Sequence, residues 1–324
     1  MSRIDNEASL HDEAARAGWL YYVGGMTQDQ IATELGVSRQ RAQRLVSRAM
    51  AEGLIQVRLS HRIGSCLDLE AQLTDRYGLM RARVVPTLGP GADVRATSPA
   101  AASELERVLR MRESKVIALG TGRSLRGMVD ALEPIEADQH RLVSLIGNIA
   151  PDGSASFFDV VMRIADKVRA PHYPMPVPVV STTAAEKQAF HALAPVQRVV
   201  ALARAADVVF VGVGQMSFDA PLLADGFVTQ AELDEMQAAG AVGEVAGWVY
   251  DSHGEYLDVG TNRRTGGVRV EQGLDRMAMG IAAGPSKVSA IAAALQSRII
   301  NSLVTDEATA AAILTADPLQ VQRK

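Results

Sequence analysis

Four arginines and two glutamines lie close together in a short segment near the N-terminus of this 324-residue chain. The segment runs from Arg39 to Arg48 and contains no acidic residue. Arginine can bind the edge of guanine through two hydrogen bonds, and glutamine can bind adenine in the same way. At helical spacing, one face of the segment carries Arg39, Gln40, Gln43, Arg44 and Ser47. The opposite stripe is apolar, so an exposed helix here could read bases in the major groove of DNA.

The elements around this segment predict a helix-turn-helix. A first helix is expected over Leu10–Val23. Thr27 is placed to cap a second, short helix, which Gly36 ends, and Ser38 to cap a third helix that runs to about Glu52. In such a unit the last helix enters the major groove with its N-terminal residues nearest the bases. A solvated, arginine-rich surface helix is the alternative interpretation. We predict these DNA-binding residues: Thr27, Ser38, Arg39, Gln40, Gln43, Arg44 and Arg48.

Three glycine-containing turns follow predicted strands in the rest of the chain. They are Gly120-Thr121-Gly122-Arg123-Ser124, Gly212-Val213-Gly214 and Gly284-Pro285-Ser286-Lys287. Backbone N–H groups and hydroxyls in such turns can hold the oxygen atoms of a ligand, and Lys287 could anchor a phosphate or a hydroxyl group. Tight turns without a ligand, and a lysine on the surface, are the alternatives. We predict these ligand-binding residues: Gly120, Thr121, Gly122, Arg123, Ser124, Gly212, Gly214, Gly284 and Lys287.

Helices and short apolar strands alternate along the remainder, which predicts an α/β fold with a mostly parallel sheet between helices. The predicted strands include Ala82–Pro86, Val116–Leu119, Leu142–Ile146, Asp207–Val213, Val245–Tyr250, Met277–Ala282 and Ser302–Val304. A further short strand is expected over Leu54–Leu59, and the Gly- and Pro-containing stretch Thr87–Ser98 predicts a loop. Ligands bind beyond the carboxyl ends of strands in open α/β sheets, so the three turns should meet at one edge. We expect a helix-turn-helix domain over 1–62 and a ligand-binding and oligomerisation domain over 63–324.

The composition excludes several classes of protein. Hydrophobic residues make up 48% and charged residues 22% of the chain, which are ordinary values for a globular protein. The net charge of −4 excludes binding of nucleic acid by the whole surface, but it leaves room for a local basic element. Cys66 is the only cysteine, so an intrachain disulfide and a cysteine-built zinc site are excluded.

Signals of catalysis, secretion and membrane insertion are absent from the sequence. The six histidines lack metal-ligand spacing, and neither a Gly-x-Ser-x-Gly elbow nor a Gly-Lys phosphate-binding loop occurs. We therefore predict no catalytic residue, no metal and no cofactor. The N-terminal segment has acidic residues where a signal peptide needs an apolar stretch, and no run approaches the roughly 18 apolar residues of a membrane span. A cytoplasmic protein without a membrane partner is expected.

Segments spread over nearly the whole chain resemble those of one family. They are Trp19–Gln28, Ile31–Ser38, Leu69–Leu73 with Tyr77–Leu79, Ala118–Leu125, Gly240–Glu244, Asp251–Gly254, Ala283–Lys287, Ala290–Leu295 and Leu303–Ala310. In their order and spacing the chain resembles the SorC family of bacterial sugar-responsive transcriptional regulators. Within that family it is most similar to regulators of polyol operons of the erythritol or sorbitol type.

The resemblance implies a regulator of a carbohydrate or polyol catabolic operon. It implies a homodimer or homotetramer that binds palindromic operator DNA, with an affinity modulated by a sugar, sugar phosphate or polyol. The effector domain would fold like glucosamine-phosphate deaminases, ribose-phosphate isomerases and CoA transferases. A sugar-phosphate isomerase or deaminase that carries a helix-turn-helix is the alternative. The family often has two glycines before the lysine, whereas this chain has Gly284-Pro285; the missing N–H of proline favours an unphosphorylated ligand.

Overall fold

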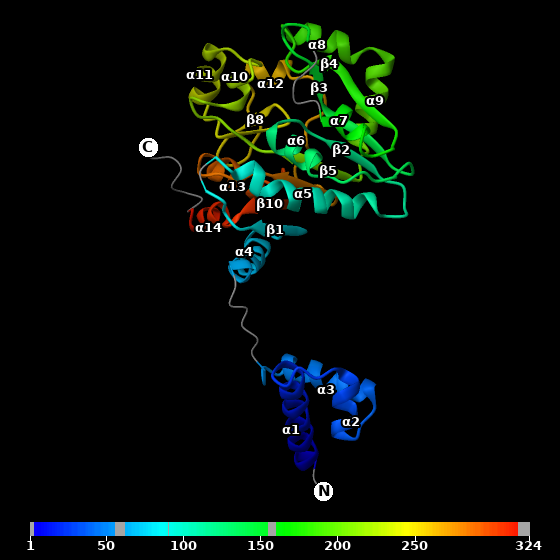
Figure 1. Cartoon of the computed structure of the whole chain (residues 1–324). Coiled ribbons are helices and arrows are strands. Elements are labelled where there is room, and N and C mark those ends of the chain that lie inside the picture. The colour runs from blue at the N-terminus through cyan, green and yellow to red at the C-terminus, as the bar shows by residue number, and fades with distance from the viewer. Residues whose placement is uncertain (1–2, 56–61, 90, 155–159, 317–324) are drawn as a thin grey trace. The chain divides into compact units, whose positions relative to one another are not determined.

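The computed structural model describes residues 3–55, 62–89, 91–154 and 160–316. The chain divides into two compact units, Met1–His61 and Arg62–Lys324, and Figure 1 shows the elements of each. Among the described residues, no helix combines the length and the apolar character that crossing a bilayer requires.

The N-terminal unit is a bundle of three helices with the predicted caps. Its helices are α1 (Arg3–Tyr22), α2 (Gln28–Leu35) and α3 (Arg39–Ala51). The backbone N–H of Thr27 donates to Gln30 Oε1 at 2.8 Å, and the Thr27 hydroxyl accepts from the N–H of Gln30, which completes a capping box. Gly36 ends α2 with a left-handed φ of 62°, and the Ser38 hydroxyl accepts from the N–H of Arg41 at the start of α3.

The core of this unit explains why the three helices hold together. Small and aliphatic side chains from all three helices are buried against one another: Ala14, Ala17, Ile31, Ala32, Ala42, Leu45, Val46 and Ala49. The predicted first helix is correct in type but begins earlier, at Arg3. The strand predicted over Leu54–Leu59 is not found at Leu54 and Ile55, and its remaining residues lie outside the described part of the chain.

The second unit is built on a seven-stranded sheet in which every pairing is parallel. The strand order is β1-β10-β9-β5-β2-β3-β4. The strands are β1 (Arg81–Val85), β2 (Val116–Leu119), β3 (Arg141–Ile149), β4 (His172–Pro178), β5 (Val208–Gly212), β9 (Met277–Ile281) and β10 (Ser302–Asp306). The mostly parallel α/β sheet expected from the sequence is therefore confirmed.

Helices cover both faces of this sheet, as alternate side chains of each strand require. Ile117 and Leu119 of β2 pack toward one face, and Val116 and Ala118 toward the other. The first face is covered by α5 (Asp93–Leu109), α6 (Arg123–Asp130) and α7 (Val160–Ala165). The second is covered by α4 (Arg62–Tyr77), α9 (Ala194–Arg204), α13 (Val288–Gln296) and α14 (Glu307–Thr315).

A smaller layer stands beside the main sheet and corrects one predicted element. The single strand expected over Val245–Tyr250 is instead a hairpin, because Ala246 and Gly247 both have positive φ and turn the chain between two strands. The small antiparallel sheet comprises β6 (Gly214–Gln215), β7 (Gly243–Val245) and β8 (Trp248–Tyr250). The remaining short helices are α8 (Ala184–His191), α10 (Pro221–Ala224), α11 (Gln230–Ala238), α12 (Gly260–Arg264) and the 3₁₀ turn η1 (Pro285–Lys287).

The loop predicted over Thr87–Ser98 is wrong beyond its first residues, because α5 begins at Asp93 and continues through Pro99. Packing against α6 overrides the local helix-breaking signal. The Ser98 side chain fills the space in which Gly127 of α6 lacks a Cβ atom, so the two helices approach closely. This correction matters for the site, because the first two turns of α5 supply three residues to a pocket described below.

Candidate functional site

Helix α3 presents a polar face to solvent. Arg39, Gln40, Gln43, Arg44 and Ser47 are exposed, and Arg48 is half-buried. The side chains between them, which include Leu45 and Val46, are buried in the helical core. An open groove runs along the outer face and is lined by Gln40, Gln43, Arg44, Ser47, Arg48 and Ala51. The structure therefore brings the predicted arginines and glutamines to one side of one helix.

The arginines of this face differ in their partners. Arg39 Nε lies 3.4 Å from Asp29 Oδ1, and Arg48 Nε lies 2.5 Å from Glu52 Oε1. Arg44, in contrast, makes no ion pair with any residue that the structure describes. Its guanidinium can therefore bind a new acceptor without first leaving a carboxylate.

Three other residues hold the helices of this unit in place. Thr27 and Ser38, both predicted to contact DNA, cap α2 and α3 through their hydroxyl groups and are themselves exposed. Arg41 Nη2 lies 2.9 Å from Glu13 Oε2 on α1, so this arginine joins two helices. The exposed N-terminus of α3 combines the backbone N–H groups of a helix start with arginine side chains, which suits a phosphate or a base edge.

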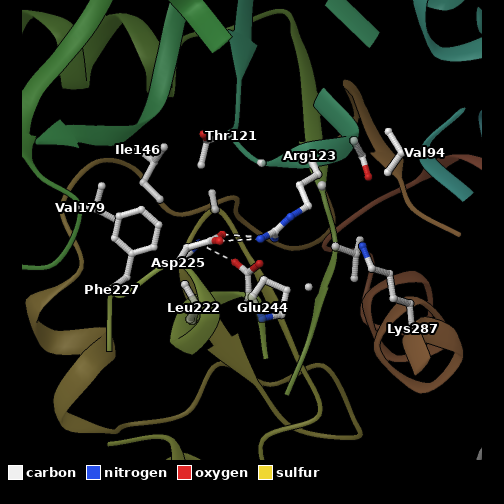
Figure 2. A pocket seen from close by; sticks show the side chains of 18 of the residues that line it. Val94, Thr121, Arg123, Ile146, Val179, Leu222, Asp225, Phe227, Glu244 and Lys287 are labelled. Carbon is white, nitrogen blue, oxygen red and sulfur yellow. Dashed lines mark hydrogen bonds and ion pairs between the residues drawn. The ribbon is translucent and has the colours of Figure 1, made fainter. Parts of the chain in front are cut away.

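A cavity of about 270 Å³ lies at the carboxyl ends of the strands in the second unit. Figure 2 shows its lining from close by. Seven of the nine predicted ligand-binding residues line it: Thr121, Gly122, Arg123, Ser124, Gly212, Gly214 and Lys287. Gly120 and Gly284 do not. The N–H of Gly120 donates to Phe210 O and extends the pairing of β2 with β5, and Gly284 forms the turn that leads into η1.

Arg123 and Asp225 form a two-pronged ion pair at the rim of the cavity. Arg123 Nη2 lies 2.6 Å from Asp225 Oδ1, and Nη1 lies 3.3 Å from Oδ2. Arg123 opens α6, whereas Asp225 directly follows α10, so the pair joins segments that are 102 residues apart. Figure 2 shows the two side chains meeting across the cavity. Such planar pairs are stronger than single hydrogen bonds and fix the orientation of both groups.

Lys287 and Glu244 place opposite charges deeper in the same cavity. Burial lowers the pKa of Lys287, and the carboxylates of Glu244 and Asp93 act in the opposite direction. Burial likewise raises the pKa of Glu244, while a hydrogen bond from the N–H of Gly247 and the charge of Lys287 oppose the rise. The two charged groups therefore stabilise each other in a partly dry environment.

The remaining wall of the cavity is apolar. Ile146, Val179, Leu222 and Phe227 line it, and Figure 2 shows Phe227 beside Ile146 and Val179. The cavity thus combines one charged side with one apolar side, which is the usual construction of a site for a small organic molecule. Among the described residues, no group of three or more His, Cys, Asp or Glu is placed to hold a metal ion.

Sequence reasoning missed several lining residues. Asp225 and Phe227 lie in a segment without a recognisable motif, and Asp93 lies in the stretch predicted to be a loop. Glu244 could have been predicted as a site residue, because it is the last residue of Gly240–Glu244, one of the segments that resemble the SorC family.

Comparisons with known proteins cover both units. A family profile described as "Putative sugar-binding domain" matches residues 61–315, and one of the MarR family matches residues 17–62. The erythritol catabolism regulatory protein EryD of Brucella abortus is 35% identical over 302 residues, which cover 93% of this chain and 96% of EryD. The full-length sorbitol operon regulator SorC of Klebsiella pneumoniae matches the structure with a TM-score of 0.71 and 26% identity, over 94% of this chain and 99% of SorC.

This chain belongs to the SorC family. A further relative of this SorC-family protein is the transcriptional regulator LsrR of Enterobacter sp., which is 32% identical over 97% of this chain and 96% of LsrR. These relatives are regulators by name, and each matches the chain from the helical unit through the α/β unit. The exposed face of α3 and the cavity therefore lie in parts of the chain that the family shares.

Proposed function

We propose that this SorC-family protein is a bacterial transcription regulator whose affinity for operator DNA is set by a small carbohydrate. The observation that carries the proposal is the presence, in one chain, of an exposed arginine- and glutamine-bearing helix and a cavity with both polar and apolar walls. The effector is a sugar, sugar phosphate or polyol. Relatives named for erythritol and sorbitol regulation support this ligand class.

Operator binding is assigned to the outer face of α3 and the two helix caps. Arg39, Arg44 and Gln43 share the exposed N-terminal part of the helix, where base contacts are made in helix-turn-helix proteins. Gln40 and Arg48 extend the face toward the flanking backbone. Thr27 and Ser38 fix the helix ends and offer hydroxyl groups to phosphates: together the assigned residues are Thr27, Ser38, Arg39, Gln40, Gln43, Arg44 and Arg48.

Effector binding is assigned to the three strand-end turns. It changes the affinity for DNA because both ligands favour particular arrangements of the same oligomer. A ligand that binds one arrangement of the oligomer more tightly shifts the population toward that arrangement, and thereby changes the spacing of paired recognition helices. A homodimer or homotetramer on a palindromic operator supplies the required pair of helices. The protein would act in the cytoplasm, where operator DNA and the products of sugar uptake are both present.

We further propose that the effector domain shares its fold with glucosamine-phosphate deaminases, ribose-phosphate isomerases and CoA transferases, without their catalysis. The relatives are named as regulators. Two carboxylates that line the cavity have partners of their own, with Asp225 bound to Arg123 and Glu244 bound to the N–H of Gly247. Groups held in this way suit binding better than proton abstraction from a substrate.

The test combines operator binding with a ligand panel on the full-length protein. Lys287→Ala should leave operator affinity unchanged and abolish the response to the effector, because the lysine lies in the cavity and not in the helical unit. Lys115→Ala is the matched control, since its ammonium pairs with the exposed Glu113 outside the cavity. A normal effector response in Lys287→Ala, or turnover of sugar phosphates by the native protein, would contradict the proposal.

A further inference from the structure

Both cations of the cavity already face carboxylates. Arg123 is held by both oxygens of Asp225. The negative charges of Glu244 and Asp93 favour the protonated form of Lys287 and act to raise its pKa. Among the residues that the structure describes, three carboxylates but two cations line the cavity, so these side chains do not supply a net positive charge. A site for a phosphate ester normally has a surplus of positive charge or of N–H donors, because the phosphate brings a charge of about −1.5 to −2 at neutral pH.

Two of the glycines in the ligand turns make room for these carboxylates. A Cβ atom on Gly214 would lie 2.2 Å from Glu244 Oε1, and one on Gly284 would lie 2.8 Å from Asp93 Oδ2. Glycines in phosphate-binding loops let the backbone approach the anion. Here the space beside these two backbones is taken by negatively charged groups of the protein itself.

The backbone donors of the lysine turn are also committed or missing. The N–H of Gly284 donates to Thr309 Oγ1 at 2.8 Å, and that of Lys287 donates to Gly284 O at 3.1 Å. Pro285 has no N–H group. Three of the four residues of this turn therefore offer no amide to an anion.

From these contacts we infer that the effector is an uncharged polyhydroxylated compound, a polyol or free sugar, and that the cavity rejects the corresponding phosphate ester. The inference rests on the proposed function and names the ligand class of its site. A hydroxyl group donates to a carboxylate and accepts from a guanidinium or ammonium, so one polyol can use Asp225, Glu244, Arg123 and Lys287 together. The N-terminus of α6 suits a hydroxyl oxygen as an acceptor, and Phe227 can cover the carbon chain.

The experiment measures binding of matched pairs of ligands to the full-length protein by calorimetry, with operator release as a second readout. The probes are erythritol, xylitol, sorbitol and a panel of free sugars, each beside its phosphate monoester, together with inorganic phosphate. The uncharged member of a pair should bind about tenfold or more tightly than its ester, because like charges placed together are strongly unfavourable. An ester that binds equally or more tightly, or competition by inorganic phosphate, would overturn the inference.

Two conservative variants test whether the carboxylates cause the preference. Glu244→Gln retains an oxygen that accepts from the N–H of Gly247, and Asp225→Asn retains the shape of the ion-pair partner. Each variant should lower the preference for the polyol, measured as the polyol's affinity divided by that of its ester, several-fold. Asp130→Asn, an exposed acid on the same helix as Arg123, should leave the ratio unchanged. An unchanged ratio in both cavity variants refutes the inference, whereas a native protein that binds no probe of either class refutes the proposed function as well.

Discussion

Arg44→Ala should weaken operator binding more than the loss of any other arginine of α3. The Arg44 side chain is exposed, lies on the outer face and makes no ion pair with a described residue. Under the proposed function, it would contact DNA without giving up an ion pair to a described residue. A bidentate contact with a base is worth about 1–3 kcal/mol, so the dissociation constant should rise by about 5- to 150-fold.

The neighbouring Arg48 sets the scale for comparison. Arg48 and Glu52 form a partly exposed ion pair one helical turn apart, which is worth about 0.3–0.5 kcal/mol and must be broken or shared when DNA binds. Arg48→Ala should therefore cost less than Arg44→Ala by about that amount. Glu52→Gln should strengthen operator binding, because it frees Arg48 and removes a negative charge close to the phosphates.

Fluorescence anisotropy with labelled operator, repeated over a range of salt concentrations, separates the possible roles of Arg44. If Arg44 reads a base, its loss should relax sequence preference at one position and leave the salt dependence nearly unchanged. If it contacts a phosphate, the slope of log affinity against log salt should fall by about 0.9. Arg169→Ala is the control, since Arg169 is an exposed arginine of the second unit that pairs with Glu136. Native affinity in Arg44→Ala would refute the assigned orientation of α3 on DNA.

Three further outcomes are expected in the second unit. Gly284→Ala should lower the free energy of unfolding by about 1–3 kcal/mol in urea titration, because φ is 116° and a Cβ atom would lie 2.8 Å from Asp93 Oδ2. Gly260→Ala is the control, because its φ is not positive and its Cβ atom would lie at an ordinary 3.9 Å from Glu235 Oε1. Phe227→Ala should weaken effector binding about tenfold in calorimetry without changing operator affinity, since part of the apolar wall is lost. Burial and two nearby cations lower the pKa of His191 from 6.5, so its stabilising contribution is present above pH 6.5 and is lost as the pH falls below it. In thermal melts, His191→Gln should therefore lose less stability than the native protein between pH 6.5 and 5, and parallel curves would contradict this assignment.

The helical unit could be predicted closely because its signals are local. The Thr27 capping box, the Gly36 stop and the Ser38 cap each depend on residues within a few positions of one another. The strand-end turns were equally accessible, since a glycine pair after an apolar run marks the end of a buried strand. The start of α1 has no such capping signal, and the predicted start at Leu10 was wrong. The predicted strand over 54–59 was wrong at Leu54 and Ile55, and its other residues lie outside the described part of the chain.

The rest of the cavity could not be predicted because it depends on distant contacts. Nothing near Asp225 in the sequence indicates that it meets Arg123, which is 102 residues earlier. Asp93 was assigned to a loop on the strength of local Gly and Pro, whereas packing of α5 against α6 makes it the first residue of a helix. The hairpin at Ala246 and Gly247 was hidden for a similar reason, since a continuous apolar run does not reveal a reversal of direction.

The division of labour along α3 has a consequence for how such a regulator can diversify. The inward side chains, Ala42, Leu45, Val46 and Ala49, hold the helix against its neighbours, and none of them is available to DNA. The outward side chains contribute little to that packing, so exchanging them leaves the scaffold intact. After gene duplication, a few substitutions on the outer face of α3 could therefore change which promoters each copy recognises. The fold of the helical unit and the effector-binding unit would remain the same.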